Sequence, residues 1–151
     1  MKNEGKAKEL LQDYRYLNQE IDNEIERLES LEGKITAVSS PSMDGMPKSN
    51  NPLFDKMADS ITKKIQLEST IKGLMEERDN KMKTIESLIR KLSKPNERAI
   101  IRMRYLDLEE WSKVLDMMFS TKVDYYEKYD SYKQRMFRVH KQALEKLDKM
   151  F

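Results

Sequence analysis

Two long segments, residues 4–38 and 53–92, repeat apolar residues at the spacing of a helix that packs along one face. In the first segment the steps are three or four residues, except for one longer step across Glu24. Such a heptad seam favours pairing with another helix, because an isolated amphipathic helix cannot bury its apolar stripe. The seam positions are Leu10, Tyr14, Leu17, Ile21, Leu28, Leu31, Ile35 and Val38. We expect Glu24 at the edge of the seam or beside a Lys or Arg, since a buried unpaired carboxylate is costly.

The second segment repeats the pattern after a loop, SSPSMDGMPKSNNP, over residues 39–52. Its proline, serine and asparagine residues are typical of loops. We predict that the two helices fold back as an antiparallel hairpin, here called the arm, over residues 1–92. Pairing with a second copy of the chain is the alternative, and a homodimer through the arm is expected. The apolar stripe of the second helix is predicted at Met57, Ile61, Ile65, Ile71, Met75, Met82, Ile85, Ile89 and Leu92. The residues expected to be buried between the two helices are Leu17, Ile21, Leu28, Ile71, Met75 and Met82.

A separate C-terminal domain is predicted over residues 95–151. Pro95 favours a new helix and pushes Lys94 out of helical dihedral angles. Two short helices follow, with a break around Asp107, and a long amphipathic helix ends the segment after a polar connector at 120–130. The core support of this unit is predicted to be Tyr105, Trp111, Val114 and Leu115. The whole chain is therefore predicted to be all-α, an arm followed by a three-helix bundle of the helix-turn-helix type.

The composition argues against an enzyme. His140 is the only histidine, there is no cysteine, and the four glycines are scattered, so no His-based catalytic group and no glycine-rich phosphate loop is expected. We expect no catalytic residue, no metal and no cofactor. The first residues lack the apolar core of a signal peptide, and no window approaches a membrane span. We therefore expect a cytoplasmic protein with no membrane partner.

Positive charge gathers on the last helix. The formal net charge of the chain is only +2. Residues 131–151, however, hold Lys133, Arg135, Arg138, Lys141, Lys146 and Lys149 against Glu145 and Asp148. Helical spacing puts Tyr132, Met136, Val139, Ala143, Leu147 and Met150 on one face, and Gln134, Arg138 and Lys141 on the opposite face. An amide and two cations suit contacts with base edges and phosphates in DNA. The alternative is a solvated face whose cations suit the helix dipole.

The sequences ERAIIRMRYLDL (97–108), EEWSKVLDMM and RMFRVHKQALEKL resemble region 4 of bacterial sigma factors. As a whole, the chain resembles a family of small phage and prophage proteins of Gram-positive bacteria, similar to the ArpU-like late transcriptional regulators. That resemblance implies a coiled-coil arm and a sigma-like end that binds double-stranded DNA. The chain departs from the helix-turn-helix motif at one point, because residues 119–130 stand where the motif has a turn of three or four residues. This length could cover the outward face of the last helix or rotate it.

The function expected is that of a phage-encoded transcriptional regulator, working in the host cytoplasm with host RNA polymerase as a further partner. The DNA-facing residues expected are Lys133, Gln134, Arg135, Arg138 and Lys141. The alternative is a structural or interaction protein, such as a coiled-coil adaptor or a small-terminase-like packaging protein. In that alternative the helix-turn-helix does not read DNA.

Overall fold

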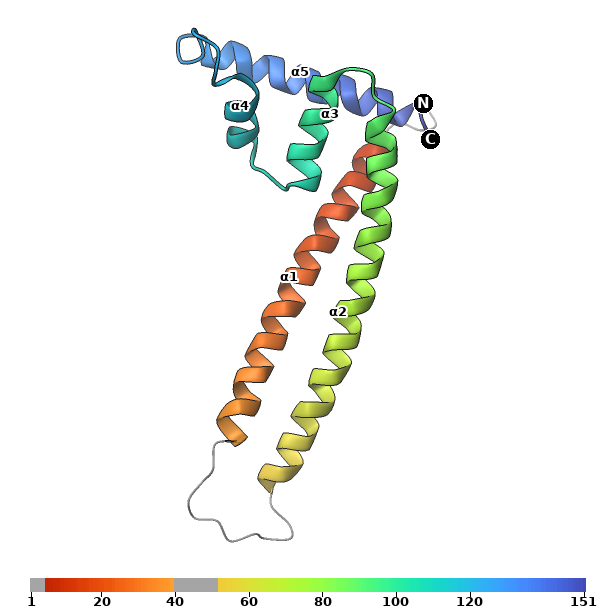
Figure 1. Ribbon diagram of the computed structural model, residues 1–151, viewed down its shortest axis with the longest axis vertical. Coiled ribbons are helices and arrows are strands. Elements are labelled where there is room, and N and C mark those ends of the chain that lie inside the picture. The colour runs from red at the N-terminus through yellow and green to blue at the C-terminus, as the bar shows by residue number, and fades with distance from the viewer. Residues whose placement is uncertain (1–4, 40–51) are drawn as a thin grey trace. The chain divides into compact units, whose positions relative to one another are not determined.

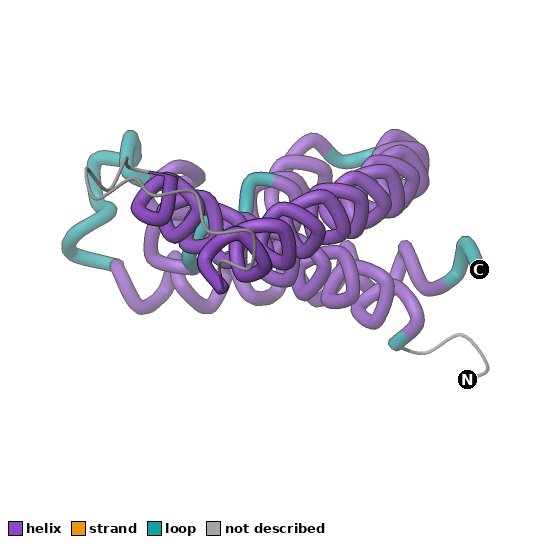
Figure 2. Tube along the Cα trace, turned by 90° about the horizontal axis from the view of Figure 1, so that it is seen from below, coloured by secondary structure: helices purple, strands orange, loops and turns teal. Residues whose placement is uncertain are grey.

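The computed structural model describes residues 5–39 and 52–151, and every regular element in these ranges is helical (Figures 1 and 2). The elements are α1 (Lys6–Ser39), α2 (Pro52–Arg90), α3 (Pro95–Ile101), the π-helical segment η1 (Arg102–Leu106), α4 (Trp111–Phe119) and α5 (Tyr129–Asp148). The all-α prediction is confirmed for these residues. The predicted loop at 39–52, apart from its two end residues, lies outside the described ranges.

Most of the predicted helix ends agree with the structure. Lys94 has extended backbone angles (φ −95°, ψ 127°), and Pro95 is the first residue of α3, as the proline requires. The break expected around Asp107 is also confirmed, because η1 ends at Leu106 and α4 begins at Trp111. In this break Leu108 has a left-handed backbone conformation, with φ of 60°.

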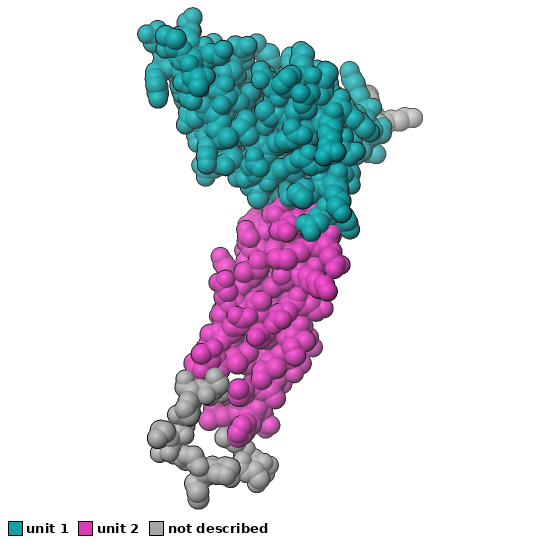
Figure 3. Space-filling model, viewed as in Figure 1, with its two compact units in different colours: residues 1–16, 79–151 teal, residues 17–78 magenta. Residues whose placement is uncertain are grey.

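The chain divides into two compact units (Figure 3). Unit 1 comprises Met1–Tyr16 and Asp79–Phe151, and unit 2 comprises Leu17–Arg78. Both α1 and α2 therefore contribute residues to both units. The domain boundary predicted between residues 92 and 95 lies inside unit 1, because the last turns of α2 share a core with the C-terminal helices.

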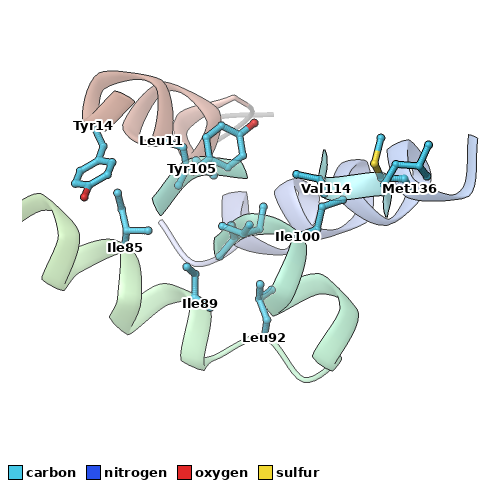
Figure 4. Packing of buried hydrophobic residues seen from close by; sticks show 14 of the residues in the cluster. Leu11, Tyr14, Ile85, Ile89, Leu92, Ile100, Tyr105, Val114 and Met136 are labelled. Carbon is cyan, nitrogen blue, oxygen red and sulfur yellow. The ribbon is translucent and has the colours of Figure 1, made fainter. Parts of the chain in front are cut away.

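The core of unit 1 is one apolar cluster built from six elements (Figure 4). The α1 and α2 segments supply about a third of it, so the C-terminal helices do not make this core by themselves. Asp148 ties the start of α1 to the end of α5, since its carboxylate accepts hydrogen bonds from the backbone N–H groups of Gly5 (3.1 Å) and Ala7 (2.8 Å). A carboxylate there satisfies free amides and suits the helix dipole. The buried members are Ala7, Leu11, Tyr14, Ile85, Ile89, Leu92, Ile100, Ile101, Tyr105, Val114, Leu115, Phe119, Tyr125, Met136, Ala143 and Leu147.

Unit 2 consists of the end of α1 and the start of α2, which run in opposite directions (Figure 1). Leu17, Ile21 and Ile71 are buried, as predicted, whereas Leu28 and Met75 are half-buried. An ion pair joins the two helices, with Lys64 Nζ 3.9 Å from Glu32 Oε1.

The interruption of the α1 seam has the predicted form. Glu24 is mostly shielded from solvent, and its carboxylate accepts two hydrogen bonds from Arg27 Nη1, at 2.9 and 3.1 Å. The partner lies one turn away on the same helix, so the charge is compensated locally.

The predicted stripe of α2 is wrong at three positions. Met82 is 38% exposed, because the seam at that level passes through Arg78 and Lys81, which are half-buried. Ile61 and Ile65 are exposed, and Ile65 keeps 62% of its surface. The half-buried positions there are Met57, Ser60, Lys64 and Leu67. The two isoleucines each follow a seam residue by one position, which turns them about 100° away from α1.

Candidate nucleic-acid interface

The inward face of α5 is fixed by the core of unit 1. Met136, Ala143 and Leu147 are buried, and Tyr132 and Val139 are half-buried. These residues recur every three or four positions, so they form one stripe that packs on α3 and α4. The inward face predicted from the sequence is confirmed.

The outward face of α5 carries the predicted polar set. Gln134, Arg138 and Lys141 are all exposed, and they share a face because they are separated by one and two helical turns. Glu145, also exposed, lies one turn beyond Lys141 and adds a negative charge at the C-terminal end of the same face. The two cations of this face, Arg138 and Lys141, therefore both precede its acidic residue.

The two other predicted DNA-facing residues lie to either side of this face. Lys133 is exposed near the start of α5. Arg135 is also exposed, but its guanidinium lies 5.6 Å from the centre of the Phe119 ring. Arg135 lines a shallow hollow with Lys94, Glu97 and Gln142, on the flank of α5 that meets α3. Of the predicted set, Gln134, Arg138 and Lys141 thus form one face, and Lys133 and Arg135 flank it.

The long connector before α5 is held by two tyrosines. Tyr125 is buried and donates a hydrogen bond of 2.5 Å to Asp116, while Tyr132 donates one of 2.5 Å to Asp124. Burial, and then the bond to Asp116, raise the pKa of the Tyr125 hydroxyl. The connector thus turns back onto α4. It leaves Arg138 exposed, so the extra residues do not cover the outward face of α5.

The single histidine, His140 of α5, packs against aromatic side chains of η1 and α4. Tyr105 Oη lies 2.7 Å from His140 Nε2, and the Trp111 and His140 rings meet edge to face with centroids 4.7 Å apart. Burial, together with the charges of Lys8 and Arg104, lowers the pKa of His140 to about 4, so the imidazole is neutral at physiological pH. The predicted core support is confirmed: Tyr105, Val114 and Leu115 are buried, and Trp111 is half-buried.

The RMRYL sequence, which carries part of the sigma-like resemblance, coincides with the π-helical segment η1. Its widened turn is closed by the Asp107 N–H, which donates to the Arg102 carbonyl at 2.8 Å. Tyr105 enters the core, while Arg102 pairs with Glu86 at 3.3 Å and Arg104 lies over the Trp111 ring at 4.6 Å. Sequence periodicity did not indicate this segment, because a five-residue π-turn shifts side chains within an otherwise helical pattern.

A buried ion pair joins α3 to α5. The Glu97 side chain is only 1% exposed, and its Oε1 lies 2.5 Å from Lys146 Nζ. Its Oε2 is buried and makes no hydrogen bond within the part of the chain that the structure describes. Nothing in the spacing of charges along the sequence indicated this pair, whose partners are far apart in the chain.

Among residues 5–39 and 52–151, no three or more histidine, cysteine or carboxylate side chains are grouped so that they could hold a metal ion. In the same ranges no helix combines the length and the apolar character of a membrane span. Comparisons of the chain with protein-family models, with curated proteins and with solved structures gave no match.

Proposed function

We propose that this protein is a phage-encoded, DNA-binding transcriptional regulator of the late-gene type, in which α5 enters the major groove. The observation that carries the proposal is the division of α5 into two faces. Met136 and Ala143 anchor one face in the core, and Arg138 and Lys141 stand exposed on the other. A groove-reading helix needs both, since the anchored face fixes the orientation of the side chains that meet the bases.

The exposed side chains fit the donors and acceptors of the major groove. Gln134 can pair with an adenine, and Arg138 can donate to O6 and N7 of a guanine. Lys133 and Lys141 are suited to phosphates, which supply affinity without sequence preference. Glu145 would repel the DNA backbone, so we place the contacts on the part of α5 that precedes it, up to Lys141.

Further parts of the proposal rest on the resemblance to the ArpU-like regulators and to sigma region 4. These parts are the presence of a coiled-coil arm, a location in the host cytoplasm, and binding to host RNA polymerase. A homodimer through the arm has an additional support in unit 2, because Phe54, Ile61 and Ile65 are exposed there. These three lie on one side of α2, since they are separated by about two turns and one turn.

The experiment that tests base reading compares binding of the wild type and of Arg138→Ala to the late-promoter region of the phage. We expect Arg138→Ala to weaken binding by about 1–3 kcal/mol and to relax the preference at one base pair. Lys133→Ala should weaken binding to all sequences alike. Arg90→Ala removes an exposed arginine from α2 and serves as the matched control. Equal affinities of Arg138→Ala and Arg90→Ala for every sequence would exclude base reading by Arg138.

A second candidate, a structural or interaction protein of the adaptor or small-terminase-like kind, is favoured by one observation. The connector exposes Val123 fully and Tyr126 to 86%, although Tyr125 between them is buried. Apolar side chains held in the open by an ordered turn are typical of contact with another protein. Absence of any DNA binding by a folded protein would favour this candidate over the regulator.

A further inference from the structure

Three cationic residues lie on two elements of unit 1 that pack together, because Leu11 and Tyr14 of α1 share a core with Tyr105 of η1 (Figure 4). Lys8 and Arg15 lie two turns apart on α1, so they share one face of that helix. Arg104 comes from η1. Burial and then the charge of Arg15 lower the pKa of Arg104, and Lys8 and Arg104 both act on His140. The α1 segment and η1 thus present like charges to the same region.

The next observation concerns acidic partners of these cations among the residues that the structure describes. Within residues 5–39 and 52–151, no carboxylate lies within ion-pair distance of Lys8, Arg15 or Arg104. Glu110 acts on Arg104 from a longer range. Two other carboxylates of unit 1 are engaged elsewhere, Glu109 with Lys113 at 3.3 Å and Asp148 with the first amides of α1. Glu110 offsets part of the repulsion between these cations, and a bound anion would offset more of it.

The guanidinium of Arg104 is held in place for such an anion. It lies 4.6 Å from the centre of the Trp111 ring, and its Nη1 donates to the Glu109 carbonyl at 3.1 Å. These contacts involve the face of the guanidinium and its Nη1, so the N–H groups of Nε and Nη2 are not used by them. A guanidinium fixed in one orientation can bind two oxygens of a phosphate at once, which a mobile lysine cannot do.

We propose that Lys8, Arg15 and Arg104 form a phosphate-binding site in unit 1, beside Trp111. The ligand class is a phosphate group, either of the DNA backbone or of a free polyphosphate. If the source is DNA, this inference rests on the proposed function and extends the interface from α5 to the first turns of α1. Lys8 and Arg15 lie outside the predicted C-terminal domain, residues 95–151, and were not among the predicted DNA-facing residues.

Trp111 is the only tryptophan, so its fluorescence reports on the site. The full-length protein is titrated with inorganic pyrophosphate and, separately, with short double-stranded DNA at constant ionic strength. Calorimetry on the same samples detects binding that leaves the fluorescence unchanged. The test variant is Lys8→Gln with Arg15→Gln, and Lys8→Gln alone serves if the double variant does not fold. The control, Lys91→Gln with Lys122→Gln, removes two exposed charges elsewhere in unit 1.

We expect saturable pyrophosphate binding by the wild type and by the control, and binding weakened at least about tenfold in the test variant. If DNA binding weakens in parallel, the phosphate is that of the backbone. If only pyrophosphate binding weakens, the site takes a free polyphosphate. Pyrophosphate binding by a protein that binds no DNA would overturn the regulator proposal and keep the site. The site itself is overturned if the wild type does not bind pyrophosphate and the test variant binds DNA no more weakly than the control does. It is also overturned if the wild type binds neither ligand.

Discussion

At the scale of single residues, the core of unit 1 contains polar contacts, and two of them join α5 to another element. Glu97 reaches Lys146, and Tyr105 reaches His140. In both contacts an ionisable group is withdrawn from water and given one partner. Such a contact adds little net stability while it is intact, but removing one partner leaves the other buried and unsatisfied.

Lys146→Met is expected to destabilise the protein by about 2–3 kcal/mol. The substitution leaves both oxygens of the buried Glu97 carboxylate without a hydrogen-bond partner. The double variant Glu97→Met with Lys146→Met should recover most of this loss, because no buried charge remains. Urea unfolding followed by circular dichroism measures both. A Lys146→Met variant as stable as the wild type would contradict the burial of Glu97.

The lowered pKa of His140 makes the free energy of unfolding depend on pH. Its pKa is about 4 in the folded protein, below the ordinary value of 6.5, so the unfolded chain binds more protons between these values. The stabilisation is fully present above pH 6.5 and is lost as the pH falls towards 4. Between pH 7.5 and 5.5 we expect a loss of about 1 kcal/mol, given that the ring is partly exposed to solvent. The chain has no other histidine, so His140→Gln should remove this loss. An equal loss in wild type and variant would assign it to other groups.

At the scale of the elements, the sequence predicted what periodicity alone decides and failed where tertiary packing decides. The extents of α1 and α2 and the inward face of α5 follow from apolar spacing and from Pro95. The pairing of Glu97 with Lys146 does not, because it needs the placement of α3 on α5. The predicted apolar stripe at the start of α2 was wrong for a related reason. A seam that passes through Leu67 and Ile71 fixes the register for the whole helix, even where that register brings Ser60 and Lys64 inward.

The exposed side of α2 gives a prediction for self-association. If Ile61 and Ile65 pair with a second copy, Ile61→Glu with Ile65→Glu should convert a dimer into a monomer without unfolding it. Sedimentation velocity at tens of micromolar, roughly the range of weak dimers, measures this. Lys63→Glu with Gln66→Glu changes two exposed neighbours and serves as the control. A wild type that sediments as a monomer throughout this range would contradict a dimer through α2.

At the scale of the whole molecule, the two units cut across the helices instead of separating the arm from the C-terminal bundle. Leu11 and Tyr14 of α1, and Ile85 and Ile89 of α2, belong to the core of the unit that contains α5. Sequence analysis placed the boundary at Pro95, where one helix has ended and the next begins. A helix end is a local signal, whereas a unit is defined by which side chains share a core.

The same division accounts for the residues that sequence analysis left out of the candidate site. Lys8 and Arg15 lie near the other end of the chain from α5, and no local spacing relates them to Arg104. The outward face of α5 could be predicted because its residues are close in sequence. The neighbouring cations could not, since the folding of α1 into unit 1 brings them there.

The central claim, that the exposed face of α5 binds DNA, is tested most directly by the dependence of binding on salt. Affinity for double-stranded DNA is measured by fluorescence anisotropy over a series of salt concentrations for the wild type. The same series is run for Arg138→Ala with Lys141→Ala and for the control Arg90→Ala with Lys91→Ala. We predict that the logarithm of the wild-type affinity falls linearly with the logarithm of salt concentration. The slope should be shallower by about 1–2 in the α5 variant and unchanged in the control. Binding that is absent or insensitive to salt, or an α5 variant that behaves like the control, would contradict the claim.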